Sequence, residues 1–285
     1  MAKFELSAFS DEYSPKFDEQ IEGLKLNGIK YMEIRGVDGK NISEITAAEA
    51  KILKQKLDDH GIKISSVGSP IGKISIKDPF EPHLELLKHI IEIAGIFECD
   101  RIRMFSFYIP KEEKPEAYKK RVMENLGKML AIAETEGVLL CHENEKGIYG
   151  DAAERCLDIQ KEFGGKIKLI FDHANFITCG VEAYPFAFDM LKDYIYYLHI
   201  KDATADKKMT PAGCGIGRIP ETIESLNKYD RTYILTVEPH LQIFTGLDKL
   251  ENTHQSKVGD QYATSAEAFK AAVDAIRNII TKLED

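Results

Sequence analysis

The sequence predicts an α/β protein in which residues 1–285 form a single domain with the fold of a (β/α)8 TIM barrel. Short apolar runs alternate with helix-like stretches, at intervals of roughly 30 residues, as parallel strands with crossover helices require. The length of 285 residues is ordinary for one barrel. The first run ends at Ser10-Asp11-Glu12 rather than at a glycine-rich turn, so an open doubly wound sheet is the second choice.

The expected strands are short, and most are rich in β-branched or aromatic residues, as buried parallel strands are. In chain order they are Phe4–Phe9, Tyr31–Gly36, Ile62–Val67, Arg101–Phe107, Val138–His142, Ile167–Asp172, Ile195–Ile200 and Tyr233–Glu238. No linker or low-complexity tract interrupts the series, so we expect these strands to belong to one barrel.

Stretches with helical periodicity separate the strands, and some carry clear end signals. Asn27-Gly28 is expected to end the first helix, and Thr46 with Glu49 has the pattern of a capping box at the start of the second. The expected helices are Asp18–Leu26, Thr46–His60, His83–Ala94, Ala117–Glu136, Ala152–Phe163, Tyr184–Asp193, Ile219–Asn227 and Ser265–Leu283.

The composition limits the classes of binding partner that we expect. A formal net charge of −9 repels phosphate backbones and anionic lipid surfaces, so we expect a small-molecule ligand and neither nucleic acid nor membrane. The five cysteines are odd in number and show no Cys-x-x-Cys spacing, which indicates free thiols. The amino terminus lacks an apolar signal core, and no run of ~18 apolar residues occurs. These features predict a cytoplasmic protein.

Four consecutive strands end in side chains that bind metals. The first candidate is Glu143, in the run Cys141-His142-Glu143-Asn144-Glu145 at the end of one strand. The others are Asp172, His199 and Glu238, at the ends of the next three strands. Side chains alternate between the barrel interior and the helix layer, and all four candidates have the parity that points inward. In a barrel the carboxyl ends of the strands meet at one face, so we expect the four side chains to converge.

Each of these residues alone has a simpler interpretation. A single Glu at a strand end is usually solvated, Asp172 could cap a helix, and His199 could be a hydrogen-bonded core histidine. Together, however, three inward carboxylates would repel one another unless a cation lies among them. Three oxygen ligands and one imidazole favour one divalent ion, Mn²⁺ or Mg²⁺, with Co²⁺ or Zn²⁺ as alternatives.

Other polar residues near the strand ends have two readings. His142, Asn144 and Asp202 have the opposite parity and are expected to face the helices, as supporting or capping groups. A second set either lines the wall opposite the four ligands or forms salt bridges inside the barrel. It comprises Glu33, Arg35 and Arg103.

At these residues the chain resembles the xylose-isomerase-like TIM-barrel superfamily of sugar phosphate isomerases and epimerases, which includes inosose dehydratase and 3-dehydroshikimate dehydratase. The resemblance spans nearly the whole chain. Its motifs are "HENE" at 142–145, "FDHAN" at 171–175, "LHIKD" at 198–202, "GCGIGRIP" at 213–220 and "VEPH" at 237–240. It implies that Glu143, Asp172, His199 and Glu238 hold the metal, and that Glu143 and Glu238 are catalytic residues on either side of the reacting carbon.

Such a site implies a metal-dependent isomerase or epimerase of a small sugar, sugar phosphate or polyol-derived ketone. The metal polarises a carbonyl, and a carboxylate removes the proton from the neighbouring carbon. Return of the proton to the opposite face gives epimerisation, and return to the adjacent carbon gives isomerisation. Loss of a β-hydroxyl instead gives dehydration, the alternative reaction on the same site.

Four further residues are candidates for substrate binding. Lys201 would hold a substrate oxygen or protonate a leaving hydroxyl, or would instead form an ion pair with Glu145 or Asp172. His240 lies above Glu238, and Arg218 follows the glycine cluster 213–217, which we interpret as a shaped loop. Asn175 stands where ketohexose epimerases of the family carry a histidine, and an amide cannot shuttle a proton. This departure weakens the epimerase assignment in particular.

Two other classes remain as alternatives. An AP-endonuclease-like phosphodiesterase would need several more histidine ligands than this chain offers, and its acidic charge argues against that class as well. A non-catalytic sugar-binding barrel would hold the metal without turning over any sugar. The connection His240–Thr264 is long enough to reach a second subunit, so a homo-oligomer is possible.

Overall fold

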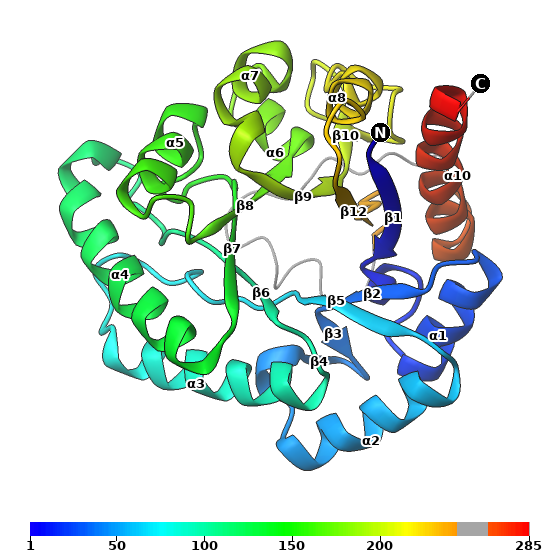
Figure 1. Cartoon of the computed structure of the whole chain (residues 1–285), viewed down its shortest axis with the longest axis horizontal. Coiled ribbons are helices and arrows are strands. Elements are labelled where there is room, and N and C mark those ends of the chain that lie inside the picture. The colour runs from blue at the N-terminus through cyan, green and yellow to red at the C-terminus, as the bar shows by residue number, and fades with distance from the viewer. Residues whose placement is uncertain (244–261, 285) are drawn as a thin grey trace.

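Parallel strands form a closed barrel in the computed structural model, which describes residues 1–243 and 262–284. Around the barrel the strands follow the order β1-β12-β9-β8-β7-β6-β5-β2, and helices surround them (Figure 1). They are β1 (Lys3–Ala8), β2 (Tyr31–Ile34), β5 (Lys63–Val67), β6 (Arg101–Met104), β7 (Leu139–Glu143), β8 (Lys168–Asp172), β9 (Ile195–Ile200) and β12 (Thr232–Val237). The barrel is closed by the pairing of β1 with both β12 and β2, so the predicted fold class is confirmed.

The helices largely follow the predicted pattern. They are α1 (Phe17–Leu26), α2 (Ala47–Asp59), α3 (Glu81–Ile96), α4 (Lys119–Glu136), α5 (Ala153–Glu162), α6 (His173–Thr178), α7 (Phe188–Leu191), α8 (Ile219–Leu226) and α10 (Ser265–Glu284). Two hairpins outside the barrel pair β3 (Gly36–Val37) with β4 (Lys40–Asn41), and β10 (Asp202–Ala203) with β11 (Met209–Thr210).

Helix α2 shows why the sequence forms these elements where it does. The Thr46 side chain accepts a hydrogen bond from the backbone N–H of Glu49, and the Glu49 carboxylate accepts one from the backbone N–H of Thr46. This is the predicted capping box. The buried residues Ala50, Leu53 and Leu57 then place one helix face on the core.

The segment after β8 differs from the prediction. The expected helix Tyr184–Asp193 is a series of short pieces: the helical turn η4 (Ala183–Ala187), α7 and the 3₁₀ turn η5 (Lys192–Tyr194). Tyr184 is extended (φ −139°, ψ 132°) because the residue before Pro185 is kept out of the helical region. Helix α6, which the sequence analysis missed, begins directly after β8 and is capped by Asp172, whose side chain accepts the backbone N–H of Asn175.

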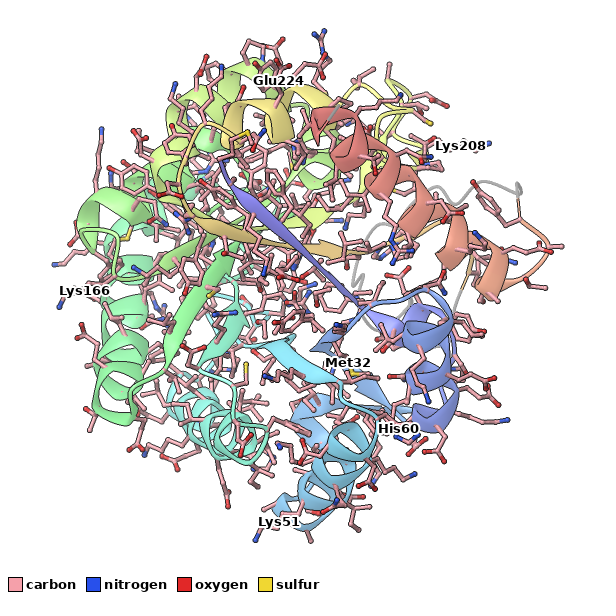
Figure 2. The ribbon with its side chains drawn as sticks, turned by 45° about the vertical axis from the view of Figure 1, so that its right-hand side comes forward. Met32, Lys51, His60, Lys166, Lys208 and Glu224 are labelled. Carbon is pink, nitrogen blue, oxygen red and sulfur yellow. The ribbon has the colours of Figure 1, made fainter. Side chains whose placement is uncertain are left out.

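Two layers of buried side chains frame the site. Outward-facing strand residues pack under the helices; Met32 lies in this layer, whereas Lys51 and Glu224 project from the outer surface (Figure 2). Inside the barrel, Cys141 and Ile170 cluster with Tyr197. This interior layer lies two residues below the predicted ligands on β7, β8 and β9. In the described part of the chain, no helix has the length and apolar character needed to span a bilayer.

Candidate metal centre

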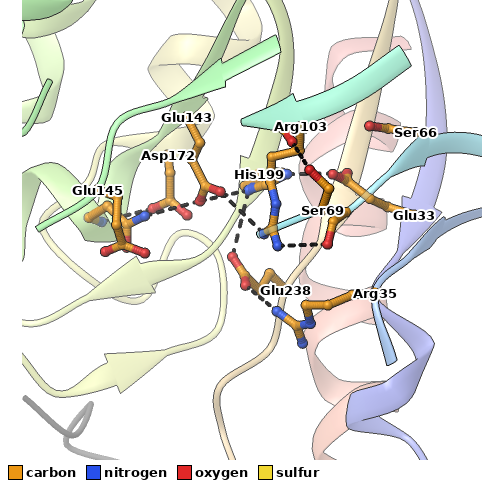
Figure 3. Close-up of polar contacts among 12 residues, drawn as sticks. Glu33, Arg35, Ser66, Ser69, Arg103, Glu143, Glu145, Asp172, His199 and Glu238 are labelled. Atoms are coloured by element: carbon orange, nitrogen blue, oxygen red, sulfur yellow. Dashed lines mark hydrogen bonds and ion pairs between the residues drawn. The ribbon is translucent and has the colours of Figure 1, made fainter. Parts of the chain in front are cut away.

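The four predicted ligands meet at the carboxyl ends of the strands. Ligand atoms of Glu143, Asp172, His199 and Glu238 all lie within 4.8 Å of one another, and all four side chains are buried. Register explains the convergence: Asp172 pairs with His199 across β8 and β9, and His199 pairs with Thr236, two residues before Glu238. Figure 3 shows these side chains turned toward a common centre.

His199 lies between the carboxylates. Its Nδ1 is 2.9 Å from Glu143 Oε1 and 3.7 Å from Glu238 Oε2, and its Nε2 is 3.2 Å from Glu33 Oε2. Although burial disfavours the charged ring, Glu143 and Glu33 raise the pKa of His199 to about 10. Glu33 also accepts a hydrogen bond from Tyr197 at 2.9 Å, so it is held in place to fix the imidazole orientation.

Each of the two glutamates predicted as ligands is held by an arginine. Arg103 reaches Glu143 at 3.3 Å, and Arg35 reaches Glu238 at 2.8 Å. Burial alone would raise the pKa of Glu143, but the positive charges of His199 and Arg103 lower it to about 2. Both arginines are therefore buried salt-bridge partners inside the barrel, which resolves the two readings left open for them.

Asp172 retains ligand capacity. Its Oδ1 accepts the backbone N–H of Asn175 at 2.8 Å, whereas its buried Oδ2 accepts no hydrogen bond, although Lys201 Nζ lies 3.3 Å away. Burial, with the negative charges of Glu238 and Glu143, raises the pKa of Asp172 to about 7. The carboxylates thus resist sharing one buried space as anions. This donor set, with an Oδ2 that accepts no hydrogen bond, fits a divalent cation.

Of the substrate-binding candidates, Lys201 and Asn175 lie in the cluster. The Lys201 ammonium is 3.3 Å from Asp172 Oδ2, so the ion pair with Asp172 that we considered is present, and it is also 3.0 Å from Glu238 Oε2, which the sequence analysis did not expect. Asn175 Nδ2 donates to Glu143 Oε1 at 3.1 Å and to the Asn144 carbonyl at 2.9 Å.

His240 and Arg218 differ in their positions. The backbone N–H of His240 donates to Glu12 at 2.7 Å, and its ring lies 3.8 Å from Glu238, so it borders the cluster. Arg218 is the N-cap residue that precedes helix α8, and its side chain is 57% exposed and pairs with Glu221. Its contact with substrate stays a prediction. Of the long connection His240–Thr264, residues 244–261 lie outside the described part of the chain, and with them the expected contact to a second subunit.

Residues that the sequence analysis missed lie behind Glu238. Glu12 accepts a hydrogen bond from Arg35 at 3.2 Å, and Asp11 forms two, at 2.9 and 3.0 Å. Burial raises the pKa of Glu12 to about 8. The run Ser10-Asp11-Glu12 was considered only as evidence against a glycine-rich turn. Its two consecutive acids directly after the first strand were the available signal.

A closed barrel with an acidic and imidazole cluster at its carboxyl face defines a class of TIM-barrel protein with a candidate metal centre. A family model described as xylose isomerase-like TIM barrel matches residues 21–271. The chain belongs to this family.

Solved structures agree in fold. The probable 3-DHS dehydratase AsbF from Bacillus anthracis has 16% identity and a TM-score of 0.72, with 98% of this chain and 99% of that chain covered. The IolI protein with a binding zinc atom has 15% identity and a TM-score of 0.73, with 98% of each chain covered. An L-ribulose 3-epimerase has 15% identity and a TM-score of 0.71, with 100% and 97% covered. A search of curated proteins found no match.

Proposed function

We propose that this protein is a metal-dependent isomerase or epimerase of a small sugar, sugar phosphate or polyol-derived ketone. The observation that carries the proposal is the convergence of Glu143, Asp172, His199 and Glu238 within 4.8 Å. Family membership and the epimerase and dehydratase among the similar structures support the same class of enzyme. Mn²⁺ or Mg²⁺ suits the oxygen-rich donor set, and the zinc of the IolI structure keeps Zn²⁺ as an alternative. The cytoplasmic location belongs to this proposal and rests on the odd number of cysteines.

When bound, the divalent ion supplies polarisation of a substrate carbonyl. The two glutamates supply bases from different strands, Glu143 from β7 and Glu238 from the end of β12. Arg103 and Asn175 orient the first, and Arg35 and Lys201 orient the second. One carboxylate takes the proton from the carbon next to the carbonyl, and a proton returned from the other side inverts that carbon.

A dehydratase is the second candidate, and Lys201 is the observation that favours it. Its buried ammonium lies 3.0 Å from Glu238, where it could protonate a departing β-hydroxyl while a carboxylate removes the α-proton, forming a C=C bond and water. Asn175 also favours the dehydratase, because its amide already donates hydrogen bonds to Glu143 and to a backbone carbonyl. It is positioned to hold a base rather than to move a proton.

The test combines metal analysis with isotope exchange. We expect about one divalent ion per chain after loading, and loss of that ion in Asp172→Ala. The loaded protein is then incubated in D₂O with a panel of ketoses, inososes and keto acids. Deuterium in recovered substrate or its isomer supports epimerisation or isomerisation, and a product lighter by one water supports dehydration.

Glu143→Gln provides the residue-level control. Gln is isosteric but cannot accept the proton, so we expect solvent deuterium exchange to fall by about 10²-fold or more. Unchanged exchange would remove Glu143 from proton transfer. A full metal complement in Asp172→Ala would refute the site, and metal binding without turnover of any substrate would favour the non-catalytic sugar-binding barrel.

A further inference from the structure

The loop that leads into helix α8 is built around the Asp202 carboxylate. Asp202 is fully buried at the start of β10. Its Oδ2 accepts the backbone N–H groups of Gly213 and Gly215, at 3.0 and 3.1 Å, and its Oδ1 accepts those of Gly217 and Ala203, at 2.9 and 2.8 Å. An ionised carboxylate offers about four acceptor positions, whereas an amide of the same shape has one acceptor oxygen and one donor nitrogen.

The glycine spacing follows from this close approach. A Cβ at position 215 would lie 2.3 Å from Asp202 Oδ1 and 2.3 Å from the Ala203 carbonyl oxygen, and one at 217 would lie 2.6 Å from Asp202 Oδ1. Neither position tolerates a side chain without displacing the carboxylate or the backbone. The backbone N–H groups of the glycine cluster therefore bind a carboxylate of the protein itself, that of Asp202.

Asp202 is the direct neighbour of Lys201. Successive side chains of an extended segment point to opposite sides, so anchoring Asp202 in the loop directs Lys201 into the barrel. There its ammonium lies 3.0 Å from Glu238 and 3.3 Å from Asp172, with the side chain 6% exposed. The hairpin of β10 with β11 also holds this backbone, by pairing Asp202 with Thr210.

The same loop contacts the neighbouring strand end. A Cβ at Gly217 would lie 3.1 Å from the Cβ of His173, the residue after Asp172. His173 Nε2 in turn lies 2.9 Å from the hydroxyl of Thr222 on helix α8. The loop and helix α8 thus bear on the ends of both β8 and β9, which carry two of the four candidate ligands.

We propose that Asp202 is a positioning residue that holds the glycine loop and thereby keeps the Lys201 ammonium among the candidate metal ligands. The inference rests on the proposed function in one respect, namely that the cluster binds a divalent ion. The ammonium and the ion compete for the carboxylates of Asp172 and Glu238. Releasing Lys201 from the cluster should therefore tighten divalent-ion binding, because a nearby positive charge is removed.

The first test measures Mn²⁺ affinity by calorimetric titration of wild type, Lys201→Met, Asp202→Asn and the double variant. We expect both single variants to bind Mn²⁺ more tightly, on the order of tenfold. A change of this size requires only a modest part of the repulsion energy between two buried positive charges. The double variant should bind no more tightly than Lys201→Met, because both changes act through the same ammonium. If Asp202 had only a structural role, the change in Mn²⁺ affinity in Asp202→Asn would have the opposite sign, since a loosened ligand set binds Mn²⁺ more weakly.

The second test needs no metal. Reductive methylation followed by peptide mass spectrometry reports the accessibility of the Lys201 amine, with the exposed Lys51 as internal standard. Gly215→Ala should act like Asp202→Asn, because its Cβ displaces the carboxylate. Gly95→Ala is the matched control, since a Cβ there meets no atom within 4 Å. We expect labelling of Lys201 at least several-fold faster in Asp202→Asn and Gly215→Ala, and unchanged labelling in Gly95→Ala.

The two tests separate the two proposals. Labelling of Lys201 at the wild-type rate in Asp202→Asn and Gly215→Ala overturns the positioning role, whatever the metal result. Where the wild-type protein binds Mn²⁺, weaker or unchanged binding in Asp202→Asn, or additive effects in the double variant, overturns it as well. Failure of the wild-type protein to bind any divalent ion refutes the proposed function, while faster labelling would still support the role of Asp202.

Discussion

Each candidate ligand has a second residue that fixes its direction. Glu33 orients the His199 ring, Arg103 orients Glu143, and Asn144 orients the backbone of Asp172. A side chain that is held before a cation arrives loses little freedom on binding it, and supporting contacts of this kind commonly contribute 10- to 100-fold in metal affinity. The strength of the site should therefore depend on residues that never touch the metal.

Asn144 gives the clearest residue-scale prediction. Its side-chain amide donates to the Asp172 carbonyl and accepts the Asp172 N–H, both at 2.9 Å. In Asn144→Leu both hydrogen bonds are lost without a change of charge, so we expect a loss of about 1–3 kcal/mol in the free energy of unfolding. Because Asp172 shifts with its backbone, we also expect divalent-ion affinity to fall by at least about tenfold.

Asn27→Leu is the matched control for this change. Asn27 Nδ2 donates to the Gly23 carbonyl at 2.8 Å, beyond the end of helix α1. The substitution at Asn27 should lower the free energy of unfolding by a similar amount and leave the metal affinity unchanged. Denaturant unfolding measures the first quantity and calorimetric titration the second. Equal metal affinities in wild type and Asn144→Leu would show that the amide supports the fold alone.

Among the elements, the loop after β5 illustrates how connections are fixed on the face that carries the cluster. Gly72 has φ +88°, and a Cβ there would lie 2.0 Å from the Phe105 carbonyl oxygen, so only glycine fits. The backbone N–H of Gly72 donates to Nε2 of His83 on helix α3 at 2.7 Å. An imidazole can accept this hydrogen bond only while it is neutral.

This contact predicts a pH-dependent contribution to stability. Burial lowers the pKa of His83 from 6.5 to about 4. Below pH 6.5 the unfolded chain gains a proton that the folded state refuses, so stability falls between about pH 6.5 and pH 4 and the loss is complete below pH 4. We expect His83 to account for about 3 kcal/mol of that loss. His83→Gln, whose carbonyl can still accept the Gly72 N–H, should show a correspondingly smaller loss in urea unfolding at pH 7 and pH 4.5. An identical pH profile would exclude this role for His83.

Elements also show what sequence reasoning could and could not reach. Strand parity is local, so the inward direction of Glu143 and Asp172 was predictable, as was the capping box of α2. The partners of those residues were not, because they depend on closure of the barrel. Arg35 and Glu238, for example, are 203 residues apart in sequence and meet only because β1 pairs with both β2 and β12. Helix α6 was missed because its six residues are too few to show a helical apolar period.

At the scale of the whole molecule, the cluster concentrates negative charge inside the barrel. Six buried carboxylates share the space with three permanent cations, Arg35, Arg103 and Lys201. The carboxylates belong to Asp11, Glu12, Glu33, Glu143, Asp172 and Glu238. Without an ion, bound protons reduce the excess of negative charge, since the pKa of His199 is raised to about 10 and that of Glu12 to about 8. With His199 neutral, as a metal ligand must be, and all six carboxylates ionised, three negative charges are in excess, and a divalent ion largely balances them. The fold therefore carries an electrostatic cost that cation binding reduces.

This balance predicts that a divalent ion stabilises the entire protein. An ion that binds only the folded chain adds about 2.7 kcal/mol at a hundredfold excess over its Kd, which corresponds to a Tm increase of roughly 5 °C for a domain of this size. We expect that increase on adding Mn²⁺ to chelator-treated protein, and its reversal on renewed chelation. Asp172→Ala should show no increase in Tm, because it lacks one of the candidate ligands. It is a suitable control, since it keeps the surface charges that bind ions loosely. An equal rise in Tm for both proteins in calorimetric scans would place the effect at the surface and remove the cluster as the site of binding.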